Sequence, residues 1–196
     1  MKYELIPIEK IKALEHVFPH HLKNLQKMIF KDGYISQPLV VENKHFIVLD
    51  GSHKHIILSM GGFKYAPVYL VDYDNPHIRV GSHRQHSFLT DKHPVTITKE
   101  DVVERGFSGN LFPPRTTRHI FTFKRPDLRI SLSDLGKREP VDMTSNIANV
   151  NISEEINHNK MFVKEIEEEI IAITEYKKQI ERTKMYLEKQ IKEMKK

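Results

Sequence analysis

Apolar and polar residues alternate with two different periods along the first 75 residues. Short apolar or alternating stretches predict strands. They are residues 3–8, residues 37–50 (two short strands around Glu42 and Asn43) and residues 66–73. Apolar residues spaced three and four apart predict helices that are closed by glycine. They are residues 19–33 and 52–62. This alternation predicts a small α/β domain with a mixed sheet.

The pattern weakens after residue 77 and becomes irregular before the last helix. Residues 98–109 predict one more helix, with Thr98 as its N-cap and its end at Gly106 or Gly109. Residues 136–151 hold Pro, Asn, Ser and Thr without a sustained period, which indicates a linker. We therefore expect a body of residues 1–135, a linker of residues 136–151 and a helical tail of residues 152–196.

The tail repeats apolar residues in heptads, which is typical of a coiled coil. One series, at the a positions, is Ile156, Val163, Ile170 and Ile191; the other, at the d positions, is Ile152, Ile166, Ile173, Ile180, Leu187 and Met194. Lys177, Lys184 and Asn159 interrupt these series. Ser153 is the expected N-cap. A helix with such a seam has to bury it, and we expect a homodimer, with packing on the chain's own body as the alternative.

Composition and charge narrow the class of protein. The 196 residues include no Cys, which excludes disulfide scaffolds, thiolate metal sites and Cys nucleophiles and favours a reducing compartment. No stretch has the length of a membrane span, and the first residues lack the order of a signal peptide. We expect a cytoplasmic protein without a membrane partner. The net charge of +5 lies in the body, because acidic and basic residues balance in the tail. A basic body suits anionic partners, although a solvated face is the more common explanation.

The stretch DGSHK (50–54) joins a predicted strand to a predicted helix. Free backbone N–H groups at such a helix start attract phosphate, and His53 and Lys54 add donors and charge. Asp50 could hold a divalent cation that bridges phosphate oxygens. The alternative is that Asp50 and Ser52 only cap the helix.

Two further stretches carry candidate chemistry. LFPPRTTRH (111–119) places two prolines before a cluster of hydroxyl, guanidinium and imidazole groups, an arrangement that suits a carboxylate, although a basic surface loop is the alternative. Glu15 precedes the first predicted helix among apolar neighbours, where a carboxylate can acquire a raised pKa and act as a base. The twelve histidines do not show the spacing of a zinc site.

The chain resembles the free L-serine kinases of the ParB/sulfiredoxin-like superfamily in four features that occur in the same order: Glu15, DGSHK, VDY (71–73) and LFPPRTTRH. These kinases use ADP in archaea and ATP in a bacterial siderophore pathway. The resemblance covers residues 3–135 and does not include the tail. It implies a ParB/sulfiredoxin-like catalytic domain that transfers a phosphoryl group from ADP or ATP to the hydroxyl of L-serine or a similar hydroxylated metabolite, giving O-phospho-L-serine in the first case.

The resemblance also implies roles for particular residues. Glu15 would take the proton of the substrate hydroxyl, and Asp50 would lie beside Mg²⁺. The nucleotide phosphates would contact the turn, namely Gly51, Ser52, His53 and Lys54. The substrate carboxylate would contact the second stretch, namely Thr117, Arg118 and His119. Such a division suits phosphoryl transfer, which depends mainly on positioning and charge neutralisation.

The chain departs from the family pattern at several positions. Lys54 replaces the usual Arg, Ser52 replaces a frequent His, and His83 and Arg84 lie where the family tends to have an aromatic residue. Ser52 also lies at the position of the sulfiredoxin cysteine, so sulfiredoxin chemistry is excluded. A ParB-like nucleotide-dependent DNA-binding or regulatory protein is the alternative function. Steep salt-dependent DNA binding would identify it.

Overall fold

A computed structural model describes residues 2–82 and 97–194. Its central sheet has four strands in the order β1 (Glu4–Pro7), β5 (Tyr65–Val71), β3 (Leu39–Glu42) and β4 (Val48–Asp50). β3 runs parallel to β5, whereas β1 with β5 and β3 with β4 are antiparallel. The mixed sheet expected from the sequence is confirmed, including the two short strands around Glu42.

Two helices pack together beside the sheet and bury its larger apolar cluster. α1 (Pro19–Asp32) ends at Gly33, whose φ of 75° is the left-handed conformation of a C-cap, and α2 (Ser52–Met60) follows β4 directly. Leu22, Ile56 and Ile57 of these helices are buried in one apolar cluster with residues of the sheet. Burial of side chains like these, at roughly 25 cal/mol per Å², fixes α2 and therefore the turn that precedes it.

A smaller layer joins the sheet on its other flank. β6 (Arg79–Ser82) pairs antiparallel with β7 (Thr117–Ile120), and α3 (Lys99–Ser108) lies between them in sequence. The sequence prediction for α3 is confirmed: Thr98 and Asp101 form a capping box at its start, and it ends at Gly109. β2 (Tyr34–Ile35) pairs with β8 (Ile130–Ser131). Within residues 2–82 and 97–194 the single-turn helices are η1 (Ile8–Lys10), η3 (Leu132–Leu135) and η4 (Thr144–Asn146).

Residues 136–151 follow the surface of the body instead of crossing open solvent. The Arg138 N–H donates to the Gly62 carbonyl and the Val141 N–H to the Ser59 carbonyl, both at the end of α2. Nearer the last helix, Ala148 and Val17 are joined through their backbones. These contacts determine where the last helix begins.

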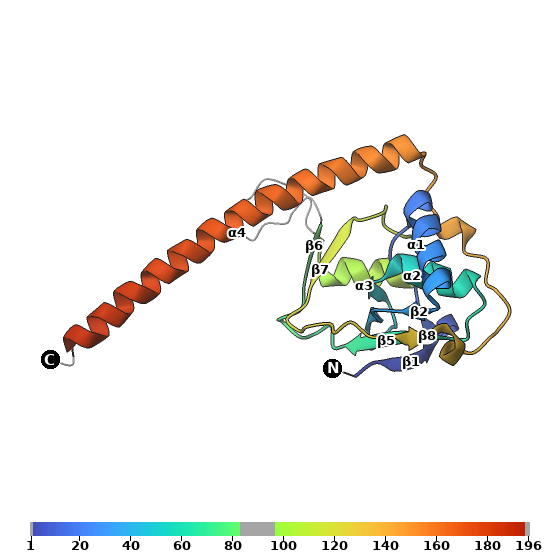
Figure 1. Cartoon of the computed structure of the whole chain (residues 1–196), viewed down its shortest axis with the longest axis horizontal. Coiled ribbons are helices and arrows are strands. Elements are labelled where there is room, and N and C mark those ends of the chain that lie inside the picture. Colours follow the sequence, from blue (N-terminus) through green and yellow to red (C-terminus); the bar gives the residue numbers. More distant parts are fainter. Residues whose placement is uncertain (1, 83–96, 195–196) are drawn as a thin grey trace.

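The last helix, α4 (Ile152–Met194), crosses the body and then projects beyond it (Figure 1). Its cap differs from the expectation. The Asn151 side chain accepts the Glu154 N–H at 3.0 Å while the Glu154 carboxylate accepts the Asn151 N–H at 2.7 Å, so Asn151 caps the helix and the prediction of Ser153 was wrong. None of the described helices combines the length and apolar character of a membrane span.

Candidate active site

The turn between β4 and α2 has the geometry that the sequence predicts. β4 ends at Asp50, Gly51 turns the chain with a φ of 101°, and α2 begins at Ser52. A side chain at Gly51 would be strained at this φ, and its Cβ would lie 3.1 Å from Leu39 Cγ. Glycine is therefore required at this tight turn from β4 into α2. Because α2 begins directly after it, the first N–H groups of the helix have no intrahelical partners.

This turn forms one side of a pocket of about 360 Å³. Residues 50–54 line it together with Glu15 and Thr117. Three parts of the chain that lie far apart in sequence are thus brought together as expected. The pocket is also lined by residues that the sequence alone did not indicate, namely His16, His21, Leu25, Val48, Leu49, Arg115 and, from α4, Phe162.

Glu15 lines the pocket and is only 9% exposed. Its Oε1 accepts the Thr117 hydroxyl at 2.6 Å and the Thr117 N–H, while its Oε2 accepts the Arg115 N–H at 3.1 Å. Burial raises the pKa of Glu15 to about 7, although these hydrogen bonds act in the opposite direction. A carboxyl with this pKa can accept a proton near neutral pH, which is the property required of a general base.

His53 and Lys54, in the first turn of α2, also line the pocket. His53 Nε2 accepts the Phe18 N–H at 3.2 Å, so this imidazole is neutral and carries its proton on Nδ1. Burial, followed by the charges of neighbouring His21 and Arg115, lowers the pKa of His53 to about 3. Lys54 Nζ donates to the Gln37 carbonyl at 2.7 Å, and burial lowers its pKa. His53 therefore offers a neutral group to a ligand, whereas Lys54 supplies positive charge.

Asp50 is paired with a cation that the sequence analysis did not select. Its carboxylate Oδ2 accepts a hydrogen bond from Arg125 Nη1, and 46% of the Asp50 side chain remains exposed. Among the described residues, no three His, Asp or Glu side chains gather into a metal cluster. A cation at Asp50 would therefore need further ligands from a bound molecule, which suits Mg²⁺ held by one carboxylate and phosphate oxygens.

Arg115 is the most informative residue that the sequence analysis missed. Its φ of 55° is left-handed, a strained conformation for a residue with a side chain, and such strain concentrates at functional sites. The guanidinium lies 5.1 Å above the Phe162 ring and 5.8 Å from the Phe18 ring. The pKa of Arg115 is lowered by burial, but a guanidinium stays charged. Arg115 thus places a positive charge at the pocket beside Glu15.

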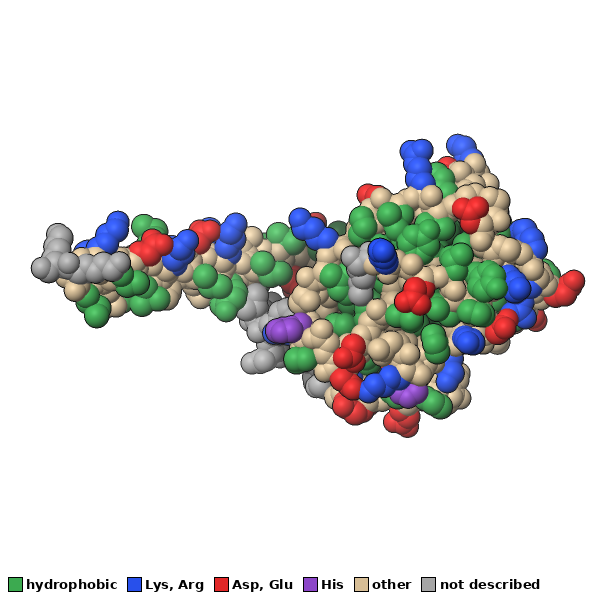
Figure 2. Space-filling view, turned by 90° about the horizontal axis from the view of Figure 1, so that it is seen from below, with side chains coloured by type: hydrophobic (Ala, Val, Ile, Leu, Met, Phe, Trp, Pro, Cys, Tyr) green, Lys and Arg blue, Asp and Glu red, His purple; other side chains and the backbone are tan. Residues whose placement is uncertain are grey.

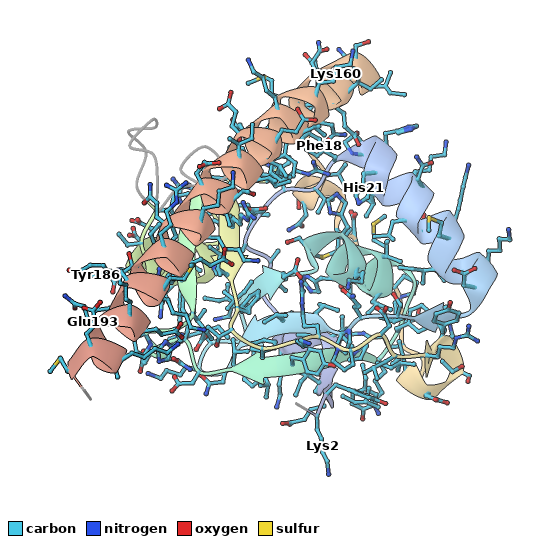
Figure 3. All side chains as sticks on the ribbon, turned by 60° about the vertical axis from the view of Figure 1, so that its left-hand side comes forward. Lys2, Phe18, His21, Lys160, Tyr186 and Glu193 are labelled. Atoms are coloured by element: carbon cyan, nitrogen blue, oxygen red, sulfur yellow. The ribbon has the colours of Figure 1, made fainter. Side chains whose placement is uncertain are left out.

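The first turns of α4 close this side of the pocket. The two carboxylate oxygens of Glu155 accept the His20 and His21 N–H groups at 3.0 and 2.9 Å, where they cap the start of α1. The ring of His158 lies 5.1 Å from that of Phe18. Figure 3 shows Phe18 and His21 at the end of α1 that meets the beginning of α4. The tail is therefore part of the site.

The structure separates the three residues expected to bind the substrate carboxylate. Thr117 lines the pocket and holds Glu15. Arg118 is outside the pocket lining and is joined to Glu169 of α4 by an ion pair of 2.5 Å. His119 is also outside it: its Nε2 lies 2.9 Å from the Tyr73 hydroxyl, and burial lowers its pKa to about 4. His83 and Arg84 lie outside the described residues.

The fold is that of a small α/β protein whose strand–glycine–helix turn lines a pocket, and comparisons with known proteins show what the chain resembles. The chain is similar to an ATP-dependent L-serine kinase of Staphylothermus marinus (strain ATCC 43588 / DSM 3639 / JCM 9404 / F1), at 26% identity over 80 residues. This match covers 39% of the chain and 32% of the relative, so it spans about a third of that protein's length. No protein-family model matches the chain.

Solved structures extend the similarity to the whole body. A free serine kinase in complex with AMP superposes with a TM-score of 0.59 at 16% identity, covering 69% of this chain and 94% of that one. SbnI with a C-terminal truncation, from Staphylococcus aureus, superposes with a TM-score of 0.54 at 14% identity, covering 83% and 95%. The chain therefore shares the fold of free serine kinase structures.

Proposed function

We propose that this protein is a kinase that transfers a phosphoryl group from ADP or ATP to the hydroxyl of free L-serine, giving O-phospho-L-serine. The observation that carries this proposal is the buried Glu15 carboxyl, with its pKa raised to about 7, in one pocket with the N-terminus of α2. The similarity to an ATP-dependent L-serine kinase and to free serine kinase structures with AMP and ADP supports it.

In this proposal the nucleotide phosphates lie against the first turn of α2. The free N–H groups of Ser52, His53 and Lys54 donate to phosphate oxygens, and the helix dipole adds to their attraction. Lys54 would contribute a point charge, since an ammonium cannot make the two-pronged contact of an arginine. Gly51 keeps the backbone accessible to the phosphates.

The carboxylate of serine needs a cation on the Glu15 side of the pocket. The resemblance assigns it to Thr117, Arg118 and His119, of which Thr117 alone lines the pocket. We propose that Arg115 takes part as well, because its guanidinium lines the pocket and can donate to both oxygens of a carboxylate. In that position serine would direct its hydroxyl toward Glu15.

Glu15 then acts as the general base. Its ionised carboxylate takes the proton from the serine hydroxyl while the serine oxygen forms a bond to the terminal phosphorus and the bond from that phosphorus to the nucleotide's bridging oxygen breaks. The products are O-phosphoserine and a nucleotide shortened by one phosphate. The resulting protonated Glu15 is well suited to its buried position.

Mg²⁺ fits the residues at the turn. Asp50 offers one half-exposed carboxylate, and Mg²⁺ bound to a nucleotide usually takes one or two carboxylates together with phosphate oxygens. Bound there, the ion would neutralise charge on the phosphates. In the structure Arg125 holds Asp50 through a hydrogen bond to its Oδ2.

The remaining assignments extend the same proposal. We propose that the body of residues 1–135 is a catalytic domain of the ParB/sulfiredoxin-like type, with residues 136–151 as the connection and residues 152–196 as a coiled-coil helix. We also propose that the helix joins two copies of the chain. The cytoplasmic location remains a prediction of the sequence.

Phosphorus NMR tests the activity directly. The protein is incubated with Mg²⁺ and L-serine, once with ADP and once with ATP, beside Glu15→Gln and the matched control Glu9→Gln, an acid on the surface of the body that pairs with Arg138. We expect O-phosphoserine with one of the nucleotides, retained in the control and nearly abolished in Glu15→Gln although nucleotide still binds. Absence of product with both bound nucleotides would refute the proposal.

A further inference from the structure

The two halves of α4 present different faces. Up to Ala172 the helix packs on the body through a stripe at helical spacing, in which Glu155 and Glu169 are buried and Phe162 is partly buried. From Ile173 to Met194 every residue is exposed. Asn159, which interrupts the d series, lies on the stripe that faces the body. Ile156 and Val163, at a positions of the first half, are 46% and 54% exposed, but the d positions Asn159 and Ile166 are partly covered by the body. Both series of the seam are therefore free for a partner only from Ile170 onward, and we call residues 170–194 the distal half.

This distal half carries an uncovered apolar seam. The apolar seam residues are between 48% and 86% exposed, namely Ile170, Ile173, Ile180, Leu187, Ile191 and Met194. Figure 2 shows hydrophobic side chains gathered along one edge of the projecting helix, with charged side chains mainly on the other. A helix with this pattern gains stability by pairing its seam with a similar seam. A second copy of the chain supplies such a seam.

We propose that two copies pair through residues 170–194 in antiparallel orientation, with the two-fold axis near Arg182. This inference deepens the homodimer proposed above and does not depend on the kinase activity. Arg182 is the midpoint between Ile170 and Met194, the first and last seam residues of the distal half. In this register every a position of one helix faces a d position of the other. The layers are Ile170 with Met194, Ile173 with Ile191, Lys177 with Leu187, and Ile180 with Lys184.

The lysines of the seam decide the direction. In a parallel pair, a positions face each other, so Lys177 would meet Lys177 and Lys184 would meet Lys184 of the second copy. Two pairs of like charges would then lie in the core of a short interface. In the antiparallel register each lysine faces an isoleucine or a leucine, along which its aliphatic part can pack while the ammonium reaches solvent.

The glutamates beside the seam point the same way. Glu181 and Glu188 occupy e positions, where they lie one turn from Lys177 and Lys184 of the same helix at 4.0 and 3.8 Å. In an antiparallel pair the e positions of the two helices lie on the same side of the interface, next to the a positions. Lys184 of one copy then approaches Glu181 of the second copy, and Lys177 approaches Glu188 of the second copy. The two copies of Glu181 meet at the axis, and both Lys184 side chains offset their charge.

A parallel pair gives these glutamates no such partners. There, e positions face g positions of the second helix. The g positions in this half are occupied by Tyr176, Thr183 and Gln190, which carry no charge at neutral pH. Charge complementarity across the interface therefore exists only in the antiparallel arrangement. The two catalytic bodies then lie at opposite ends of a paired segment about 36 Å long.

Cysteine cross-linking tests the direction, and the chain is suited to it because it has no native cysteine. Ile173→Cys and Ile191→Cys are oxidised separately and as a mixture, after sedimentation velocity on each full-length variant. In the antiparallel register, residue 173 of one copy lies directly opposite residue 191 of the second copy. It lies about 27 Å, along the helix axis, from residue 173 of the second copy. We expect disulfide-linked dimers in the mixture and not in either variant alone. Thr183→Cys, beside the axis, should link to itself.

Other outcomes overturn the inference in distinguishable ways. Disulfides within each separate variant would show a parallel pair. A dimer that forms none of these disulfides would refute the register, and a monomer at all concentrations would refute the homodimer as well. None of these results bears on the phosphoryl transfer, which the NMR experiment tests by itself.

Charge reversal gives an independent test of the same interface. Glu181→Lys with Glu188→Lys should weaken the dimer roughly tenfold or more, because each new lysine approaches a seam lysine of the second copy. The control, Glu175→Lys with Glu193→Lys, makes the same change in net charge at f and c positions, away from the seam. Circular dichroism confirms that helix content is retained. Equal weakening in both variants would refute the pairing.

Discussion

The raised pKa of Glu15 has a consequence for folding that can be measured without any substrate. In an unfolded chain a glutamate has a pKa of 4.5, whereas burial raises the pKa of Glu15 to about 7 in the folded protein. Between these values the folded state binds more protons at Glu15 than the unfolded state does. The free energy of unfolding therefore falls as pH rises through this window.

The magnitude follows from the size of the shift. Each pKa unit corresponds to about 1.36 kcal/mol, so a shift of this size gives a loss of about 2 to 3 kcal/mol between pH 5 and pH 8. Glu15 is 9% exposed, so solvent does little to reduce this figure. In Glu15→Gln the glutamine does not titrate. Its new contacts, including a mismatch with the Arg115 N–H, change the free energy of unfolding by the same amount at each pH.

The assay is urea unfolding of the original chain and Glu15→Gln at pH 5, 6, 7 and 8. We expect the stability of Glu15→Gln relative to the original chain to rise by about 2 to 3 kcal/mol over this range. Glu9→Gln, a surface control, should show no such trend. A flat difference between Glu15→Gln and the original chain would show that Glu15 ionises like an exposed glutamate, and the reasoning that makes it a base near pH 7 would fail.

Three further predictions concern the pocket. The kcat of the proposed phosphoryl transfer should rise with pH up to about 7 and then level off, because only ionised Glu15 takes the serine proton; a pH–rate profile flat from pH 5 to 8 would contradict this. Gly51→Ala should lower stability by about 1 kcal/mol or more and weaken ADP or ATP binding in calorimetry, whereas Gly33→Ala, which is equally left-handed but has open space around it, should lower stability alone. Phe162→Leu should raise the KM for serine about two- to fivefold with nucleotide affinity unchanged, because the ring orients Arg115; Met161→Leu, on the exposed face of α4, should change neither.

Local sequence patterns were sufficient for the α-helices, for the strands of the central sheet and for the glycine turn between β4 and α2, but not for the short strands β2, β6 and β8. The spacing of apolar residues and the positions of Thr98, Gly33 and Gly51 determined where helices and turns lie, because caps and left-handed glycines act within a few residues of their own position. Glu15 could be selected because a carboxylate among apolar neighbours stands out in the sequence itself. Its raised pKa required burial, which only packing of distant segments supplies.

Tertiary structure decided which residues share the pocket. Arg115 and Arg118 are both arginines in one stretch, and no local rule separates them; the left-handed turn at Arg115 directs one side chain to the pocket, while Arg118 pairs with Glu169. Phe162 and Arg125 reach the site across more than 70 residues of sequence from the turn, so their contacts depend on how the whole chain packs.

The heptad pattern of the tail determined by itself that α4 carries an apolar seam. The path of α4 over the body decided which part of that seam is partly covered and which part remains free for a partner. Periodicity in the sequence predicts an apolar face of a helix but does not show what packs against that face.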